Sequence, residues 1–351
     1  MKSASAASRK VTSRRPVIHT IESLRQHLQT AIEVEHFTIP PYLCALYSIP
    51  EGANEAAARV MKSVVMEEML HMVLVANVLN AVGGHPRVNV KGFVPRYPAH
   101  LPHSGNKFKV SLEKFSKRSV GTFLKIERPA KPHAPPEGTR YHTLGQFYEA
   151  VEDDLKWLCR TPAEEKKVFS GKRSLQITPE YYYGGGGEVM EIYNLETALK
   201  ALSAIVDQGE GIDHTIFDGD DRIFGQDREY AHYFRFNEIL EGCYYTARDT
   251  PRSGPRGGEF PVDWNAVYDM RPNPRAEEYR RGSEVRRKLD DFNRAYMELL
   301  DTLHRSVNGE RELLLNGVGV MYDLKYLAEA LMKIPSGKGK TVVGPSFECV
   351  P

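Results

Sequence analysis

Apolar residues recur at three- and four-residue steps in six segments of the chain, a spacing that places side chains on one face of an α-helix. The segments run approximately over residues 20–49, 55–82, 143–160, 189–210, 227–247 and 276–333. Asn308 and Gly309 interrupt the last segment, so we predict two helices there. The pattern therefore predicts an all-α protein.

The stretch between about residues 83 and 142 breaks this pattern. Proline, glycine and histidine are frequent in it, and short alternating runs such as FKVSLEKF predict little helix. We expect residues 83–188 to form a long irregular insertion and loops between bundle helices 2 and 3, and residues 276–333 to form accessory helices. Residues 1–18 are basic and rich in small residues, which predicts a disordered tail. A single domain over residues 19–351 follows.

The composition limits the kinds of molecule that we expect this protein to bind. Of the 351 residues, 26% are charged and the formal net charge is only +1, too little to attract nucleic acid or an anionic membrane. Four cysteines without a Cys-x-x-Cys pair argue against a disulfide framework and a zinc ribbon, and fit a reducing cytoplasm. We find no secretory signal and no run of about 18 apolar residues that would span a membrane. We expect a cytoplasmic protein that acts on a small molecule, with a homo-oligomer left open.

Two predicted helices carry a glutamate and a histidine inside an apolar seam. Glu68 and His71 lie in the second helix, and Glu229 and His232 repeat the Glu-x-x-His pattern in the fifth segment. The i, i+3 spacing turns both side chains of a pair to one side of the helix. Burial of such groups is costly unless they are paired, hydrogen-bonded or bound to metal. The other seam residues are Ala57, Met61, Val64, Val75, Val78 and Val82 in the second helix, and Phe236, Ile239 and Cys243 in the fifth.

The first and fourth helices each add a lone glutamate. Glu35 lies in the middle of the first apolar stripe, and Glu210 follows Val206 by four residues at the end of the fourth. Two lone glutamates with two Glu-x-x-His pairs make the ligand set of di-iron or di-manganese carboxylate bundles. Carboxylates bridge two cations and balance their charge, while each imidazole binds one ion and leaves positions open. We expect two metal ions. Iron is the metal we expect, although manganese and zinc accept the same ligands.

Chance and ordinary packing offer simpler explanations for single motifs. With 12 histidines, about one chance Glu-x-x-His is expected, and a third copy, Glu33 with His36, faces away from the stripe that holds Glu35. Either favoured pair taken alone is equally consistent with an ion pair. Glu210 stands between glycines, where a solvated cap or turn is usual. The alternative ligands are His36, His214 and Glu238.

Several long motifs, in one order from about residue 19 to the C-terminus, carry a family resemblance. They are AIEVEHFTIPPYLCALYSI, VVMEEMLHMVLVANVLNAVGG, TPEYYYGGGG, IVDQGEG, EYAHYFRFNEI and GPSFECVP. The chain resembles the ferritin-like domain of iminophenyl-pyruvate dimer synthases, which include violacein- and rebeccamycin-pathway enzymes that couple two oxidised tryptophan units. The resemblance implies a ferritin-like four-helix bundle and, position by position, the metal ligands Glu35, Glu68, His71, Glu210, Glu229 and His232.

The resemblance also implies a function, a dimetal oxidoreductase of secondary metabolism that uses dioxygen or peroxide. Those enzymes carry a further large region that this sequence lacks, so we expect a stand-alone member acting on an amino-acid-derived or aromatic metabolite. Two other functions stay open. One is metal storage or detoxification without an organic substrate, and the other is a structural bundle with a polar hydrogen-bond network.

A tyrosine and glycine segment precedes the fourth helix. Tyr181, Tyr182 and Tyr183 come directly before Gly184 to Gly187. Because glycines permit unusual backbone angles, we expect these tyrosines to form a mobile aromatic lid over a substrate. A storage bundle would have little need of such a loop.

Overall fold

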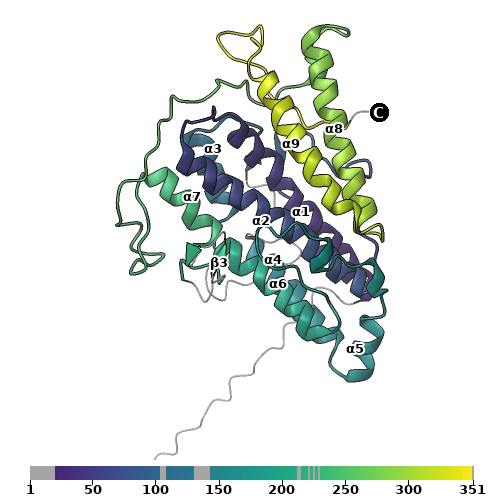
Figure 1. The fold of residues 1–351 in the computed structure, drawn as a ribbon. Helices are drawn as coiled ribbons and strands as arrows, with labels where there is room; N and C mark the ends of the chain where they lie inside the picture. The colour runs from purple at the N-terminus through teal and green to yellow at the C-terminus, as the bar shows by residue number, and fades with distance from the viewer. Residues whose placement is uncertain are drawn as a thin grey trace, which may run out of the picture.

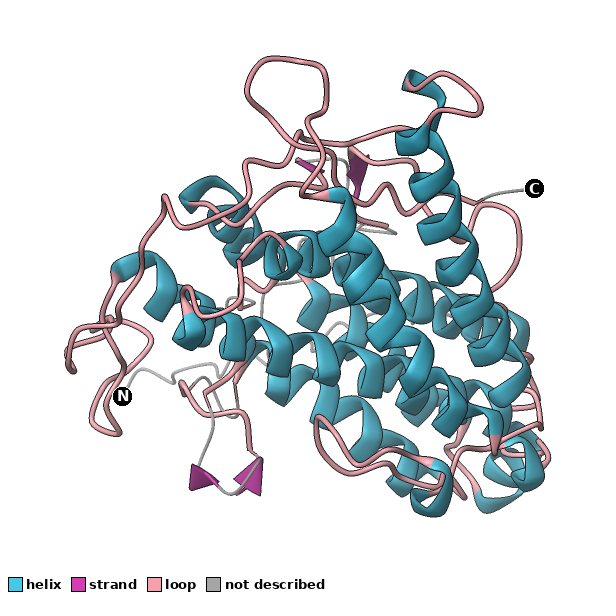
Figure 2. Ribbon diagram, turned by 45° about the horizontal axis from the view of Figure 1, so that its top comes forward, coloured by secondary structure: helices cyan, strands magenta, loops and turns pink. Residues whose placement is uncertain are grey.

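Helices make up most of the residues that the structure describes, and the strands among these residues are two residues long (Figure 2). The computed structural model describes residues 20–102, 108–129, 143–211, 215–219, 222–223, 226–227 and 230–349. The α-helices are α1 (Ile21–Tyr47), α2 (Glu55–Ala81), α3 (Lys117–Ile126), α4 (Leu144–Leu158), α5 (Pro162–Val168), α6 (Leu195–Glu210), α7 (His232–Glu241), α8 (Glu284–Ser306) and α9 (Leu313–Leu331). The short 3-10 helices are η1 (Arg173–Leu175), η2 (Pro179–Tyr181) and η4 (Ala276–Glu278). The all-α prediction is confirmed.

The short strands form two antiparallel pairs. β1 (Ala99–His100) pairs with β2 (Lys109–Val110), and β3 (Arg222–Ile223) pairs with β4 (Gln226–Asp227). The first pair includes part of the alternating run noted in the sequence.

The central helix is α2. Every side chain from Leu70 to Ala81 is buried, because α1 runs beside α2 and both α6 and α7 also contact it. Among the described residues, α2 is the one helix long and apolar enough to cross a membrane, yet 89% of that window is buried inside the molecule. Glu67, Glu68 and His71 interrupt the apolar residues of α2, so it contains no unbroken run of 18, and these apolar residues serve helix packing.

Further helices close the bundle around α1 and α2. α4 packs against α6 and α1, while α3 packs against α7 (Figure 1). α8 and α9 pack on each other and lie along one side of the bundle, where α9 contacts α1 (Figure 1). This arrangement leaves the junction of α1, α2, α3, α6 and α7 as the interior of the bundle.

The stretch predicted to hold little helix contains one helix, α3, which was not among the predicted segments. Val120, Phe123 and Ile126 bury one face of this ten-residue helix. Ser116 caps its start by accepting a hydrogen bond from the Ser119 amide, with the Ser119 side chain bonding back. Three apolar positions are a weak signal in a sequence rich in proline and glycine, so packing against α7 decides the conformation.

The predicted limits of several helices need correction. α6 begins at 195 rather than 189 because Asn194 accepts a hydrogen bond from the Thr197 amide. α7 is shorter than the predicted 227–247, since β4 occupies its expected start and Gly242 ends it with φ of 68°. The break between α8 and α9 includes Gly309, with φ of 122°, close to the predicted position. The predicted tail over residues 1–18 lies outside the described residues.

Candidate metal centre

Five buried ionisable side chains meet inside the bundle. Glu35 comes from α1, Glu68 and His71 from α2, Glu127 directly follows α3, and His232 is the first residue of α7. Each of the five is at most 3% exposed. They form two groups, Glu35 with Glu68 and His71, and Glu68 with Glu127 and His232. Within each group the ligand atoms lie within 4.8 Å of one another, and Glu68 belongs to both.

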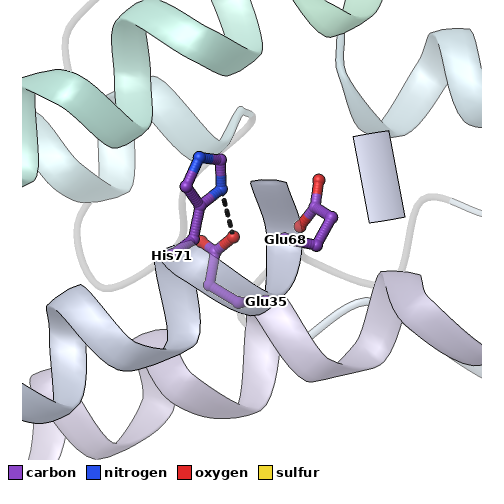
Figure 3. A group of neighbouring side chains, drawn as sticks. All are labelled: Glu35, Glu68 and His71. Carbon is purple, nitrogen blue, oxygen red and sulfur yellow. Dashed lines mark hydrogen bonds and ion pairs between the residues drawn. The ribbon is translucent and has the colours of Figure 1, made fainter. Parts of the chain in front are cut away.

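The first group is shown in Figure 3. His71 Nδ1 lies 3.1 Å from Glu35 Oε2, and the carboxylate of Glu68 lies beside this pair. The hydroxyl of Tyr148, from α4, donates to Glu35 Oε1 at 2.5 Å. The hydroxyl of Thr38 lies 3.0 Å from Glu68 Oε2. Neighbouring helices therefore fix the orientation of both carboxylates.

The second group has the same construction. His232 Nδ1 lies 3.1 Å from Glu68 Oε1 and 3.5 Å from Glu127 Oε2. The hydroxyl of Tyr42, from α1, donates to Glu127 Oε1. Each ligand group, or half of the centre, thus has one imidazole and one carboxylate of its own, which accepts a hydrogen bond from a buried tyrosine. The two halves share Glu68.

Burial and mutual repulsion set the ionisation of these groups. Burial, followed by the charge of Glu127, raises the pKa of Glu68 to about 8. Burial alone would raise the pKa of Glu35, but the hydrogen bond and charge of His71 outweigh it, so the pKa is lowered. Burial opposes a charge on His71, yet the hydrogen bond to Glu35 raises its pKa. Three carboxylates in one buried space require protons or cations to balance them.

The donor set fits two metal ions. Both imidazoles turn Nδ1 toward the carboxylates, so each half offers one nitrogen and carboxylate oxygens to a cation. A cation between these atoms would replace the protons that otherwise bridge them and would compensate the buried negative charge. Oxygen and nitrogen ligands of this kind suit iron, manganese and zinc alike.

A cavity opens from this centre between α4 and α6. Its inner wall is made of the five ionisable side chains. Leu144 from α4, with Ile205 and Val206 from α6, gives it apolar walls. The cavity provides a place for a small molecule beside the carboxylates.

Glu210 lines the same cavity, but its carboxylate has another contact. Glu210 Oε1 accepts a hydrogen bond from the Gly145 amide at 2.8 Å, near the start of α4. The structure therefore brings Glu210 to the centre without placing it in either ligand group, and its role as a ligand stays a prediction. The predicted ligand Glu229 lies outside the described residues.

Glu127 was not among the ligands predicted from the sequence. It comes from the end of α3, in a stretch for which no helix was predicted. The available signal was the apolar spacing of Val120, Phe123 and Ile126, which ends immediately before this glutamate.

The three tyrosines proposed as a lid are not among the residues that line this cavity. Tyr182 is 8% exposed and donates to Gly185 O at 2.6 Å, and its ring centroid lies 4.4 Å from that of Tyr183. Arg311 stacks over the ring of Tyr181 at 4.4 Å. The glycines pack on α2, where a side chain at Gly186 would meet backbone atoms. These contacts are those of a packed loop, and the role of the three tyrosines as a lid stays a prediction.

Two of the alternative ligands, His36 and Glu238, make their hydrogen bonds away from the cavity. His36 Nε2 lies 2.5 Å from the Tyr296 hydroxyl on α8, and Glu238 accepts from the Tyr245 amide at 2.6 Å. Neither lines the cavity. His214 lies outside the described residues.

Comparison with known proteins places this chain in a family. A family model described as Ferritin-like matches residues 28–241, which include all five side chains of the centre. The chain belongs to the ferritin-like family. A solved structure, a ferritin-like protein from Caulobacter vibrioides, matches with a TM-score of 0.63 at 22% identity, over 96% of this chain and 100% of that chain. That likeness supports the fold.

Two characterised relatives confirm the resemblance stated from the motifs. Dichlorochromopyrrolate synthase of Lentzea aerocolonigenes is 26% identical over 320 aligned positions, which cover 81% of this chain and 29% of that protein. The 2-imino-3-(indol-3-yl)propanoate dimerase of Chromobacterium violaceum is 23% identical over 376 positions, covering 93% and 34%. This ferritin-like chain spans about a third of the length of these two relatives.

Proposed function

We propose that this ferritin-like protein is a dimetal oxidoreductase that acts on a small amino-acid-derived or aromatic metabolite. The observation that carries the proposal is the meeting of three buried carboxylates and two imidazoles at a cavity between α4 and α6. The relatives support the class, because both are named as enzymes that make indole-derived or chromopyrrolate compounds.

Each side chain of the centre has a role in this proposal. Glu68 would bridge the two ions, Glu35 and His71 would hold one, and Glu127 and His232 would hold the other. Two such ions, iron in our expectation, would supply electron transfer with dioxygen or peroxide as oxidant. Glu210 would complete the ligand set from the edge of the cavity.

The cavity walls favour a particular kind of substrate. Leu144, Ile205 and Val206 offer contacts to an aromatic or aliphatic body. The tyrosine donors to Glu35 and Glu127 would keep the carboxylates oriented while substrate enters and water leaves.

The first test is elemental analysis of protein purified without added metal, repeated with Glu68→Ala and His71→Ala. We expect about two transition-metal ions per wild-type chain, none in Glu68→Ala, which removes the shared ligand, and about one in His71→Ala. Glu238→Gln is the matched control, because it alters a buried carboxylate outside the cavity and should keep both ions. A wild-type chain that binds no ion even after iron is supplied would refute the proposal and favour a structural bundle.

The second test is oxygen consumption with aromatic amino acids and their 2-imino acids. We expect consumption that depends on the organic compound and disappears in Glu68→Ala. A protein that binds metal but consumes oxygen only in proportion to added iron would instead be a storage or detoxification bundle. A cytoplasmic location also stays a prediction, which fractionation of the source cells would test.

A further inference from the structure

The two histidines of the centre donate to chemically different partners. His71 Nε2 lies 2.7 Å from Gln208 Oε1, an amide oxygen on α6. His232 Nε2 lies 2.7 Å from Glu67 Oε2, a carboxylate oxygen on α2. Gln208 is 3% exposed and Glu67 is fully buried. The two halves therefore have the same kinds of donor facing the metal positions. They differ in the group that accepts the hydrogen bond from the imidazole Nε2.

The backbone fixes the orientation of the Gln208 amide. Gln208 Nε2 donates to the carbonyl oxygen of Gly186 at 3.1 Å, which leaves Oε1 to face His71. Since an amide oxygen only accepts, His71 Nε2 must carry a proton, and Nδ1 is left for the metal side. The packed glycine loop thus determines which nitrogen of His71 can bind an ion.

Glu67 is held as an anion. Arg235 Nη1 donates to Glu67 Oε1 at 2.9 Å, and Arg235 Nη2 pairs with Glu67 Oε2. The nearest group to His232 Nε2 is therefore an ionised carboxylate.

We infer that the two metal positions are inequivalent and that the position beside Glu127 and His232 fills first. This inference rests on the proposed dimetal function. An imidazole that donates to a carboxylate is a stronger electron-pair donor through its other nitrogen than one that donates to a neutral amide. Within the two ligand groups each half has one imidazole, one carboxylate of its own and a share of Glu68, so Glu67 and Gln208 act as the positioning residues that set the order.

Arg235 weakens this difference without removing it. Its positive charge offsets part of the field of Glu67, but Glu67 Oε2 is the atom that accepts the imidazole proton. A metal ion on Nδ1 makes the Nε2–H more acidic, which strengthens a hydrogen bond to an anion more than one to an amide. The preference for the His232 side therefore remains.

Titration of the metal-free full chain with Co²⁺ tests the order. By calorimetry we expect two binding steps whose affinities differ by about 10- to 100-fold, the size typical of such outer partners. Anomalous diffraction from wild-type crystals with one equivalent of Co²⁺ should show the ion beside Glu127 and His232. Equal steps, or a first ion beside Glu35 and His71, would overturn the inference and leave the dimetal proposal standing. A wild-type chain that binds no Co²⁺ would defeat both.

Two variants separate positioning from a merely structural role. Glu67→Gln should weaken the first step by about 10- to 100-fold and leave the second nearly unchanged, while Gln208→Leu should weaken only the second. Circular dichroism melts establish that each variant is folded. If both variants lowered the two steps equally, the assignment of each partner to one position would be refuted. The wild-type diffraction experiment decides the order if either variant fails to fold.

Discussion

Glu68 and Glu127 occupy unequal places in the centre, because Glu68 belongs to both ligand groups and Glu127 to one. We predict that Glu68→Ala loses both ions, whereas Glu127→Ala retains about one, held by Glu35, Glu68 and His71. Elemental analysis of both variants, prepared side by side, measures this. A Glu127→Ala chain that keeps two ions would show that Glu127 is not a ligand.

Individual side chains differ in how far the sequence could predict them. Glu35, Glu68 and His71 were predictable because they interrupt long apolar seams, where a charged group needs a reason to be buried. Glu127 was not, since it comes after a short helix and faces the centre only once α3 packs on α7. The spacing of apolar residues does not mark Glu67. Its role depends on its contacts with His232 and Arg235.

Glu238 should make stability depend on pH. Burial raises its pKa to about 7 from an ordinary value of 4.5, so the folded protein holds a proton that the unfolded chain releases. This stabilisation is complete below about pH 4.5 and is lost as the pH rises through about 7. We predict that Glu238→Gln gains stability relative to wild type over that window, by up to about 3 kcal/mol.

Urea denaturation of both proteins at pH 5, 6, 7 and 8, as trial conditions of about one-unit spacing, measures the difference. Because the metal ligands are present in both chains, their titration cancels in the comparison. A difference that does not change with pH would mean that Glu238 titrates normally.

At the scale of elements, the glycine loop and α2 approach each other closely. Gly184 and Gly186 have similar positive φ values, 75° and 80°. A Cβ at Gly184 would meet nothing within 4 Å, whereas one at Gly186 would lie 2.6 Å from Met66 O and 2.8 Å from Glu67 N. Both positions favour glycine for its backbone angle, but only Gly186 is also confined by the helix.

We predict that Gly184→Ala costs about 1 kcal/mol of unfolding free energy, from the left-handed angle alone. Gly186→Ala should cost about 1–3 kcal/mol more, because backbone atoms cannot move aside as a flexible side chain can. It should also weaken metal binding, since Gly186 O orients Gln208 behind His71. Chemical denaturation and Co²⁺ titration measure the two effects, and equal costs for the two variants would refute the close packing.

The elements themselves were predictable where the apolar period is long and uniform, as in α1 and α2. The first and last residues of a helix were harder to predict where a single contact decides where the helix begins or ends. The start of α6 depends on the side chain of Asn194, and the start of α7 depends on the strand pair that precedes it. Sequence alone likewise cannot show that Gly185 and Gly186 lie against Met66, because this contact depends on how the loop packs on α2.

At the scale of the whole molecule, the centre joins parts of the chain that are far apart in sequence. Glu35 and His232 come from near opposite ends of the matched residues 28–241. Ions bound there would connect α1, α2, α7 and the end of α3, while α8 and α9 lie outside this connection (Figure 1). The overall fold could be predicted because seams on separate helices must face one another, whichever loops join them.

This connection predicts a large effect of metal on stability. Because the unfolded chain cannot bring the ligands together, each ion stabilises the folded state by about 4 kcal/mol when it is present at 1,000 times its dissociation constant. We therefore expect a chelator to lower the melting temperature of the wild-type protein, and added metal to restore it. Glu68→Ala, which removes the shared ligand, should melt at a temperature independent of both additions. A wild-type melting temperature that a chelator leaves unchanged, with the ions shown to be removed, would mean that the polar network supports the bundle without them.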